Sequence, residues 1–281
     1  MAGTLYLCAT PIGNLEDMTL RVLEILKTSD VIAAEDTRNT RKLLNHFAIQ
    51  TPMTSYHEHN KAVKGPQLVE RLRKGEQIAL VTDAGMPGIS DPGADLVRLC
   101  YAADIPVTVA PGASAAVAAL VLSGLDTRRF VFEGFLPAEK KERRMTLEML
   151  KKEHRTMIFY EAPHRLIETL DELETIFGAK RQMAVVRELT KKFEEVRRGT
   201  LEELRVHFSK QPPRGEFVLL AAGYTLEQQK KAEMESWEEI SIEAHMQRYL
   251  SQGMSEKDAM KQTAKDRGVS KREIYSYLHK G

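Results

Sequence analysis

Short continuous apolar segments alternate with longer amphipathic ones along the first 110 residues of the chain. Continuous apolar runs are typical of buried strands, whereas apolar residues spaced three and four apart are typical of helices. The pattern predicts strands at residues 5–9, 31–34, 53–56, 78–83 and 107–110. Between them it predicts helices at 20–27, 37–47, 63–74 and 92–103. This alternation predicts an α/β domain with a largely parallel sheet.

A second α/β region is predicted after the sequence Pro111-Gly112-Ala113-Ser114, which interrupts the first and precedes an alanine-rich helix at 115–122. Its strands are predicted at 130–133, 157–160, 182–186, 194–198 and 217–222. Beyond residue 223 the chain is rich in Glu, Lys and Gln and predicts a helical appendage. We therefore expect an N-terminal α/β domain at 1–112, a C-terminal α/β domain at 113–223 and a helical tail at 224–281.

The end of the tail carries two helix-start signals. Ser255 with Asp258, and Ser270 with Glu273, have the spacing of capping boxes. Gly268, between the two signals, predicts that one helix ends there and a second begins, which is a helix-turn-helix-like arrangement. We expect Ile274 and Leu278 to pack the tail on the body of the protein or on a partner subunit.

Composition narrows the class of protein. The 281 residues are 42% hydrophobic and 29% charged, and no apolar stretch approaches the roughly 18 residues that a membrane span requires. The N-terminus begins with a strand-like segment and lacks the features of a signal peptide. Cys8 and Cys100 fall in a predicted strand and helix, so we expect both to be buried and reduced. These features predict a cytoplasmic protein without membrane contact.

Positive charge is concentrated in three regions although the net charge is only +1. Lys and Arg outnumber Asp and Glu by eight to three at 36–74, by seven to three at 180–198 and by eight to four at 245–281. Local positive patches can guide a polyanion to a protein of nearly neutral total charge. Each patch is also compatible with an ordinary solvated helix face.

Two loops rich in Gly and Pro, residues 10–15 and 82–93, follow predicted strands. Glycine lets the backbone approach a ligand closely, and ligands of open α/β sheets bind outside the carboxyl ends of the strands. The fingerprints G-x-G-x-x-G and G-x-x-x-x-G-K-[ST] are absent from these loops, which disfavours a pyrophosphate ligand. The eight His residues are scattered without metal-ligand spacing, and a G-x-S-x-G motif is absent, so we expect neither a metal site nor an acyl-transfer triad.

Six motifs occur in a specific order along the chain. They are TPIGNL (10–15), AEDTR (34–38), TDAGMPGISDPG (82–93), PGASA (111–115), FEGFLP (132–137) and YEAPHR (160–165). The ordered set resembles the tetrapyrrole-methylase superfamily over about residues 1–223. Over the whole chain it resembles the branch called ribosomal RNA small subunit methyltransferase I.

The resemblance implies two α/β domains of the tetrapyrrole-methylase type with S-adenosylmethionine in the cleft between them, usually in a homodimer. The branch implies methylation of the ribose 2′-hydroxyl of a decoding-region cytidine in small-subunit (16S) rRNA, as free RNA or as the assembled 30S subunit. One alternative is a precorrin-type tetrapyrrole methyltransferase, which would need neither the basic patches nor the tail. Another is a non-catalytic nucleic-acid-binding regulator, for which the intact ligand loops would have no use.

By resemblance, one set of residues would bind the cofactor. These are Pro11, Asp83, Ala84, Gly85, Ile89, Ser114, Ala115, Phe132, Gly134, Ala184 and Gly215. Two of these residues also have a purely structural explanation. Ser114 is a typical helix N-cap residue, and Phe132 is typical of a hydrophobic core. Ala184 and Gly215 would admit the adenine because they are small.

A sulfonium methyl group is already activated, so the enzyme must mainly align the hydroxyl and accept its proton. Glu35, Asp36 and Arg38, at the end of the second strand, are the candidates for gripping or deprotonating the ribose. Asp36 or the residue after it could equally cap the following helix. Glu188 is a reserve candidate, together with Lys191.

The cations that we expect near RNA phosphates are Arg38, Arg41, Lys42, Arg165, Arg187, Lys191 and Lys192. In the tail, Lys265, Arg267, Lys271, Arg272 and Tyr275 could add contacts with RNA or the ribosome. If several of these cations act together, binding should depend strongly on salt.

Overall fold

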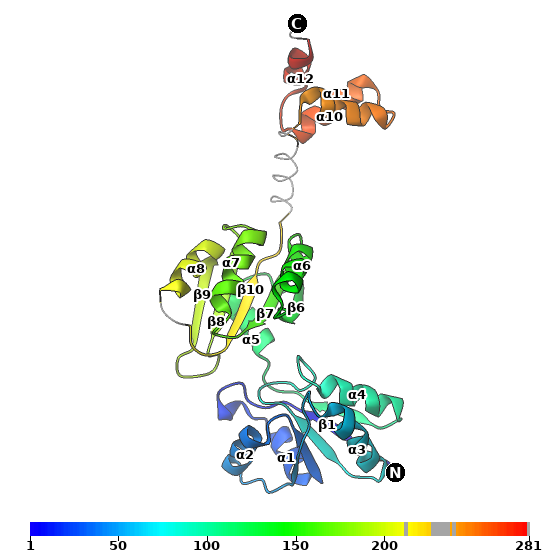
Figure 1. Cartoon of the computed structure of the whole chain (residues 1–281), viewed down its shortest axis with the longest axis vertical. Helices are drawn as coiled ribbons and strands as arrows, with labels where there is room; N and C mark the ends of the chain where they lie inside the picture. The colour runs from blue at the N-terminus through cyan, green and yellow to red at the C-terminus, as the bar shows by residue number, and fades with distance from the viewer. Residues whose placement is uncertain (211–212, 226–236, 238–239, 280–281) are drawn as a thin grey trace. The chain divides into compact units, whose positions relative to one another are not determined.

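The computed structural model describes residues 1–210, 213–225, 237 and 240–279 (Figure 1). The chain forms two compact units, Met1–Ala222 and Gly223–Gly281, which are described separately below. The first unit contains two five-stranded sheets, and the second contains helices.

The first sheet is wholly parallel and has the strand order β3-β2-β4-β1-β5. Its strands are β1 (Leu5–Cys8), β2 (Val31–Ala34), β3 (Met53–Ser55), β4 (Ile78–Val81) and β5 (Val107–Ala110). The connecting helices are α1 (Leu20–Thr28), α2 (Thr37–His46), α3 (Lys61–Arg73) and α4 (Gly93–Ala102), with a short 3₁₀ turn, η1 (Leu15–Asp17), before α1. The predicted alternation and the parallel sheet are both confirmed, and the predicted ends differ by a few residues.

Helices cover both faces of this sheet. Side chains of α3 and α4, including Leu68 and Leu96, pack on one face, whereas Val22 and Leu26 of α1 and Leu44 of α2 pack on the other. Every residue of β2 and β4 is buried as a result, which explains why these strands are continuous apolar runs in the sequence.

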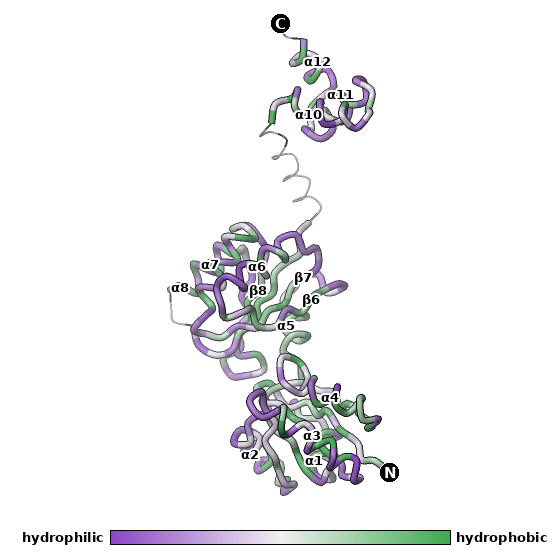
Figure 2. Tube along the Cα trace, turned by 45° about the vertical axis from the view of Figure 1, so that its right-hand side comes forward, coloured by the Kyte–Doolittle hydropathy of each residue, from purple (hydrophilic) through white to green (hydrophobic). Residues whose placement is uncertain are grey.

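The second sheet is mixed and has the order β6-β7-β10-β8-β9. Its strands are β6 (Phe130–Phe135), β7 (Thr156–Glu161), β8 (Gln182–Arg187), β9 (Glu195–Thr200) and β10 (Phe217–Ala221). β6 and β7 are parallel, and the other neighbours are antiparallel. In Figure 2 the central strands of this sheet are hydrophobic, as expected for a sheet covered on both faces.

One face of the second sheet packs against three helices, α6 (Lys140–Leu150), α7 (Leu166–Phe177) and α8 (Leu201–Ser209). The other face packs against α5 (Ala115–Ser123), whose Ala116 and Ala119 lie against Ala184 and Leu220. Small side chains on α5 let the helix approach the sheet closely. The predicted alanine-rich helix therefore forms part of the core of the first unit.

The second unit contains α10 (Ile242–Ser251), α11 (Glu256–Asp266) and α12 (Lys271–Leu278). Their apolar side chains form one cluster that includes Met246, Met260 and Ile274, with Leu278 packed against it. Our expectation that Ile274 and Leu278 pack on the body or on a partner was wrong, because they complete the core of the tail itself.

The start of α12 carries the predicted capping box between Ser270 and Glu273. At the start of α11 only half of the predicted box forms: the Ser255 hydroxyl accepts from the Asp258 N–H, but the Asp258 carboxylate accepts from that hydroxyl at 2.6 Å. An Asp side chain is one methylene shorter than Glu, which explains why it does not reach back to the backbone N–H as Glu273 does.

Among the described residues, no helix is both long and apolar enough to span a membrane. Cys8 and Cys100 are buried and unpaired, as predicted. Burial raises the pKa of the Cys8 thiol to about 12 and that of Cys100 to about 11, so both remain neutral thiols at physiological pH.

Candidate functional site

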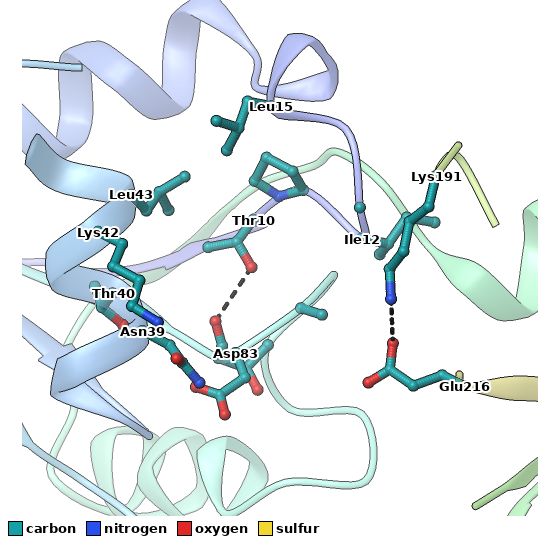
Figure 3. Close-up of a pocket in the computed structure, with 14 residues that line it drawn as sticks. Thr10, Ile12, Leu15, Asn39, Thr40, Lys42, Leu43, Asp83, Lys191 and Glu216 are labelled. Carbon is teal, nitrogen blue, oxygen red and sulfur yellow. Dashed lines mark hydrogen bonds and ion pairs between the residues drawn. The ribbon is translucent and has the colours of Figure 1, made fainter. Parts of the chain in front are cut away.

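A pocket of about 400 Å³ opens at the carboxyl ends of β1 and β4, beside α2 (Figure 3). It is lined by Thr10, Pro11, Ile12, Gly13, Leu15, Asn39, Thr40, Lys42, Leu43, Thr82, Asp83, Ala84, Lys191 and Glu216. Both halves of the first unit therefore contribute to one cavity. Its position at the carboxyl ends of parallel strands is the usual ligand site of open α/β sheets.

The two Gly/Pro-rich loops meet at the floor of this pocket. Thr10 and Gly85 exchange backbone hydrogen bonds of 2.9 and 3.0 Å, and the Thr10 hydroxyl donates to the Thr82 carbonyl at 3.1 Å (Figure 3). Gly85 has a φ of +81°, a conformation that L side chains rarely adopt. Glycine is therefore needed where the loops cross.

The carboxylates of Glu35, Asp36 and Asp83 lie in or beside the pocket, but their hydrogen-bond partners differ. Glu35 accepts a hydrogen bond of 2.6 Å from the Thr82 hydroxyl, and Asp83 accepts one of 3.2 Å from the Asp36 N–H. Of the three, only Asp83 lines the cavity. The structure thus places Glu35 and Asp36 beside the pocket wall and Asp83 in it.

Asp36 is the N-cap of α2, as the alternative interpretation proposed. Its carboxylate accepts from the Arg38 N–H at 2.8 Å and from the exposed Arg38 guanidinium at 2.9 and 3.2 Å. These hydrogen bonds from Arg38 lower the pKa of Asp36 to about 2. A carboxylate held in this way is a weak proton acceptor.

The pKa of the Asp83 carboxyl is shifted in the opposite direction from that of Asp36. Desolvation raises the pKa of its carboxyl, and repulsion from Glu35 raises it further, while hydrogen bonds from the Asp36 backbone and the Asn39 side chain oppose the change. A carboxylate with a raised pKa is a better proton acceptor near neutral pH. The close-up shows its oxygens beside the Asn39 amide (Figure 3).

The loop between β8 and β9 closes the pocket from the second half. Glu188 and Thr190 both have positive φ, at 51° and 64°, which is rare for residues with side chains. The Thr190 hydroxyl accepts from the Asn14 N–H at 3.1 Å. A Cβ on Gly13 would lie 2.6 Å from Cγ of Lys191, so the two loops are in tight contact.

Lys191 extends along this contact toward the cavity (Figure 3). Its ammonium pairs with Glu188 at 3.0 Å and with Glu216 at 3.2 Å. These two carboxylates raise the pKa of Lys191 against the opposing effect of its desolvation. Lys42 is the second cation of the pocket, and within the described part of the chain it has no carboxylate partner.

The other predicted RNA-binding cations lie in different surroundings. Arg165 donates to the Leu136 and Pro137 carbonyls at 3.0 and 3.1 Å. Arg187 pairs with Glu195 at 2.7 Å. By contrast, Arg41 and Lys192 are exposed, on α2 and beside the pocket loop respectively. Arg165 and Arg187 thus have structural partners, whereas Arg41 and Lys192 are accessible to a ligand.

A second surface, formed by residues predicted to bind the cofactor, lies where the 82–93 loop meets β6. Gly134 has a φ of +66°, and a Cβ there would lie 3.1 Å from the Ser90 hydroxyl. Ile89, in the same loop, is 52% exposed. This surface therefore combines an exposed apolar side chain with a glycine that lets a ligand approach the backbone closely.

The N-terminus of α5 adjoins this loop, because a Cβ on Gly85 would lie 3.4 Å from the Ala113 carbonyl. Ser114 is the N-cap residue, yet its side chain makes no capping hydrogen bond, and the first turn has no acidic residue. Backbone N–H groups at the start of such a helix suit a carboxylate or ribose oxygen. Together with Ala115, Ile89 and Gly134, these features fit a small ligand with both polar and apolar parts.

Three other predicted cofactor residues are engaged within the protein. Ala184 is fully buried in the cluster beneath α5. Gly215 has a φ of +86°, and a Cβ there would lie 2.3 Å from the Glu188 carboxylate, so its small size accommodates that side chain. Phe132 contacts the ring of Tyr160 edge to face at 5.0 Å.

Several pocket residues were not singled out from the sequence. They are Thr10, Ile12, Gly13, Leu15, Asn39, Thr40, Leu43, Thr82 and Glu216. Thr10, Ile12, Gly13, Leu15 and Thr82 belong to the two loop motifs, which the sequence identified as segments without assigning a role to these residues. Asn39 lies in the first turn of α2 and Glu216 next to Gly215, where no local pattern indicates a ligand.

Comparison with known proteins places this site in context. The family model of Tetrapyrrole (Corrin/Porphyrin) Methylases matches residues 4–205. Ribosomal RNA small subunit methyltransferase I of Halalkalibacterium halodurans is 52% identical over 99% of this chain and 95% of its own. The protein of the same name from Bacillus subtilis is 49% identical over 99% and 94%.

Solved structures share the fold of the first unit. A diphthine synthase has a TM-score of 0.61 at 14% identity and covers 80% of this chain and 91% of its own. A cobalt precorrin-4 methyltransferase has a TM-score of 0.57 at 18% identity and covers 78% and 94%. Identities this low support the fold alone.

Proposed function

Since the chain belongs to the tetrapyrrole methylases, and along its whole length to the family of ribosomal RNA small subunit methyltransferase I, we propose that it methylates a ribose 2′-hydroxyl in small-subunit rRNA. We propose a cytidine of the decoding region as its target. Methyltransferases of this family use S-adenosylmethionine, which is therefore the methyl donor. The observation that carries the proposal is the relationship over 99% of the chain, tail included, to proteins named for this RNA.

The surface between the 82–93 loop and α5 would hold the methyl donor. The backbone N–H groups of Ser114 and Ala115, at the start of α5, suit its carboxylate or ribose, and Ile89 with Gly134 suits its apolar parts. When bound, S-adenosylmethionine supplies a methyl group that is activated by a positively charged sulfur. The chain's own residues then have to orient the ribose and remove its proton.

We propose that Asp83 accepts the proton of the 2′-hydroxyl at a carboxylate oxygen. It lines the pocket, its pKa is raised, and the Asp36 N–H with the Asn39 amide holds its orientation. Glu35 favours this role because its charge raises the pKa of Asp83. Asp36 and Arg38 would act indirectly, by capping the helix that carries Asn39.

The cations around the pocket would bind the RNA backbone. Lys42 and Lys191 line the cavity, and the exposed Arg41 and Lys192 lie on the same two elements. Each phosphate contact made by such residues releases a counterion, so RNA affinity should fall steeply with salt.

We also infer that the protein acts in the cytoplasm as a homodimer. Val117 and Val121, four residues apart on α5, are exposed on a helix that is otherwise apolar and packed. Apolar side chains at this spacing are typical of a face that packs against another protein surface.

The test uses tritiated S-adenosylmethionine with three acceptors: assembled small subunits, naked rRNA and a precorrin. We expect label on ribosomal material, at an alkali-resistant dinucleotide that contains cytidine. Label only on the precorrin would support a tetrapyrrole substrate, and no label anywhere would support the non-catalytic alternative; either result would overturn the proposal.

The catalytic assignment is tested by Asp83→Asn with Asp36→Asn as its matched control. Loss of a general base typically reduces turnover by about 10²–10⁴-fold, so Asp83→Asn should lower kcat by at least about 100-fold and leave cofactor affinity near normal. In the wild type, kcat should rise with pH as the Asp83 carboxyl ionises. A normal kcat in Asp83→Asn, with a large loss in Asp36→Asn, would assign the base to Asp36.

A further inference from the structure

The second unit has a compact core of its own, and within its described residues one face of α12 lies outside that core and is exposed. Ile274 is buried and Leu278 partly buried, so they mark the side of α12 that packs on α10 and α11. At 3.6 residues per turn, Arg272, Tyr275 and His279 lie together on another side, and Lys271 lies beside them at the edge next to Leu278. We call these four residues the α12 face; all of them are exposed.

The α12 face is positively charged and free of acidic residues. Lys271 and Arg272 have no carboxylate partner in the described part of the chain. Glu273 is the one acidic residue of α12, and the capping box with Ser270 engages its side chain. The face therefore has two cations available to a polyanion.

The same face carries an ordered aromatic surface. The rings of Tyr275 and His279 stack at 4.1 Å between centroids with an angle of 16°. His279 is held further by a hydrogen bond of 3.0 Å between its Nδ1 and the Tyr275 carbonyl. Tyr275 remains 53% exposed, so a ring surface is available beside the two cations.

A buried polar network fixes the helices that present this face. The ring of His245 is fully buried and accepts from Arg267 at 3.1 Å, while Arg267 also donates to the Ile240 carbonyl. Asp266 accepts from Tyr249 and from Gln262. Arg267, which the sequence suggested as an RNA contact, is therefore engaged in holding α11 to α10.

We propose that the α12 face is an RNA-binding surface of the tail, which binds unpaired nucleotides of the rRNA that the first unit methylates. Lys271 and Arg272 contact phosphates, and an unpaired base stacks on Tyr275. Stacking on an aromatic ring beside basic side chains is the usual means of binding single-stranded RNA. The deep, narrow major groove of duplex RNA would not admit the helix, which favours unpaired nucleotides.

This inference extends the proposed function, because it takes RNA as the substrate class. A tail that binds RNA raises the local concentration of substrate at the first unit, since both units belong to one chain. Its loss should therefore raise KM for RNA and leave kcat and cofactor affinity unchanged.

The test measures binding of the full-length chain to a short fluorescein-labelled single-stranded oligoribonucleotide by fluorescence anisotropy, without cofactor. Tyr275→Ala should weaken binding by roughly tenfold, because a stacked base contributes about 1–3 kcal/mol. The matched control is Tyr277→Ala, which removes an equally exposed tyrosine (49% against 53%) two residues along the helix, on another side. We expect Tyr277→Ala to change the Kd by less than about twofold.

The cations are tested by the double variant Lys271→Ala/Arg272→Ala against Lys257→Ala/Lys261→Ala, which removes the same charge from exposed positions of α11. Loss of two phosphate contacts should reduce the slope of log K against log salt by about 1.4. The α11 variant should retain the wild-type slope. Unchanged binding in both α12 variants, or equal losses in their controls, would overturn the inference.

Two further outcomes separate this inference from the proposed function. If the α12 variants bind naked RNA normally but bind assembled subunits weakly, the face contacts a ribosomal protein and the inference is wrong. If wild-type chain binds RNA through the α12 face yet methylates no rRNA, the proposed function fails and the inference stands.

Discussion

The tight contact between Gly13 and the Glu188–Lys191 loop allows a quantitative prediction for Gly13→Ala. A Cβ at this position would lie 2.6 Å from Cγ of Lys191, 2.7 Å from the Thr190 hydroxyl and 2.8 Å from the Leu189 carbonyl oxygen. The carbonyl belongs to the backbone, between two residues of positive φ, and cannot rotate away as a side chain could. The added methyl group must therefore separate the two loops.

The cost follows from the contacts that are disturbed. Overpacking of this kind costs about 1–3 kcal/mol, and loss of the hydrogen bond from the Asn14 N–H to Thr190 costs about 1 kcal/mol. We expect the free energy of unfolding of the first unit to fall by about 2–4 kcal/mol, a decrease in Tm of roughly 4–16 °C for a unit of this size. Because both loops line the pocket, their separation would misalign the ribose, so turnover should fall at least tenfold.

Urea denaturation and steady-state methylation of small-subunit RNA measure the two effects. The control is Gly65→Ala, whose Cβ would also lie 2.6 Å from a neighbour, but that neighbour is Cδ1 of Leu99, the mobile end of a half-exposed side chain. Gly65 lies within α3, where Ala is favoured over Gly by about 1 kcal/mol. If Gly13→Ala proves as stable and as active as Gly65→Ala, the two loops do not form the rigid contact that we describe.

Three further predictions concern other parts of the molecule. Arg143→Leu should destabilise the first unit by about 3 kcal/mol in urea denaturation, because the buried Arg143 is the ion-pair partner of Glu172; a loss below about 1 kcal/mol would contradict this. The tail should lose stability as pH falls from about 7 toward 5, since burial lowers the pKa of His245 and only the unfolded chain gains a proton there. The fluorescence of Trp237, the one tryptophan in the sequence, reports this loss of stability because its ring stacks on His245 with 3.7 Å between ring centroids. The variant His245→Gln should abolish the pH dependence. Asp36→Ala should lower stability more than Asp36→Asn, because Asn can still cap α2; equal losses would mean that the cap contributes little.

The sheet of the first half was predictable because its central strands are buried on both faces. Continuous apolar runs such as residues 31–34 and 78–81, too short to span a membrane, are typical of strands that are buried between two layers of helices. The edge strand β9 was less well predicted. Its exposed Arg197 and Arg198 carry no burial signal, and the strand extends to Thr200, two residues beyond the predicted end.

The candidate site was predictable only where local sequence determines it. Gly85 and Asp83 stand in a loop motif, whereas Asn39 and Glu216 reach the pocket through the arrangement of distant elements. The opposite pKa shifts of Asp36 and Asp83 differ in origin: Arg38, two residues away in the sequence, lowers the first, whereas desolvation and then the distant Glu35 raise the second. Amphipathic spacing showed that Ile274 would be buried but could not identify the surface that buries it.

The strand order has a consequence for synthesis of the chain. β4 lies between β2 and β1, so β1 has no neighbouring strand until residues 78–81 or 107–110 have been made. During translation the first strand, which leads into Thr10, must remain unpaired while the following three helices form. Docking of β4 then brings Thr10, Glu35 and Thr82 together in one step. The pocket is therefore a late product of folding, because a nascent chain that stops before residue 78 contains Thr10 and Asn39 but neither β4 nor the lining residue Asp83 that follows it.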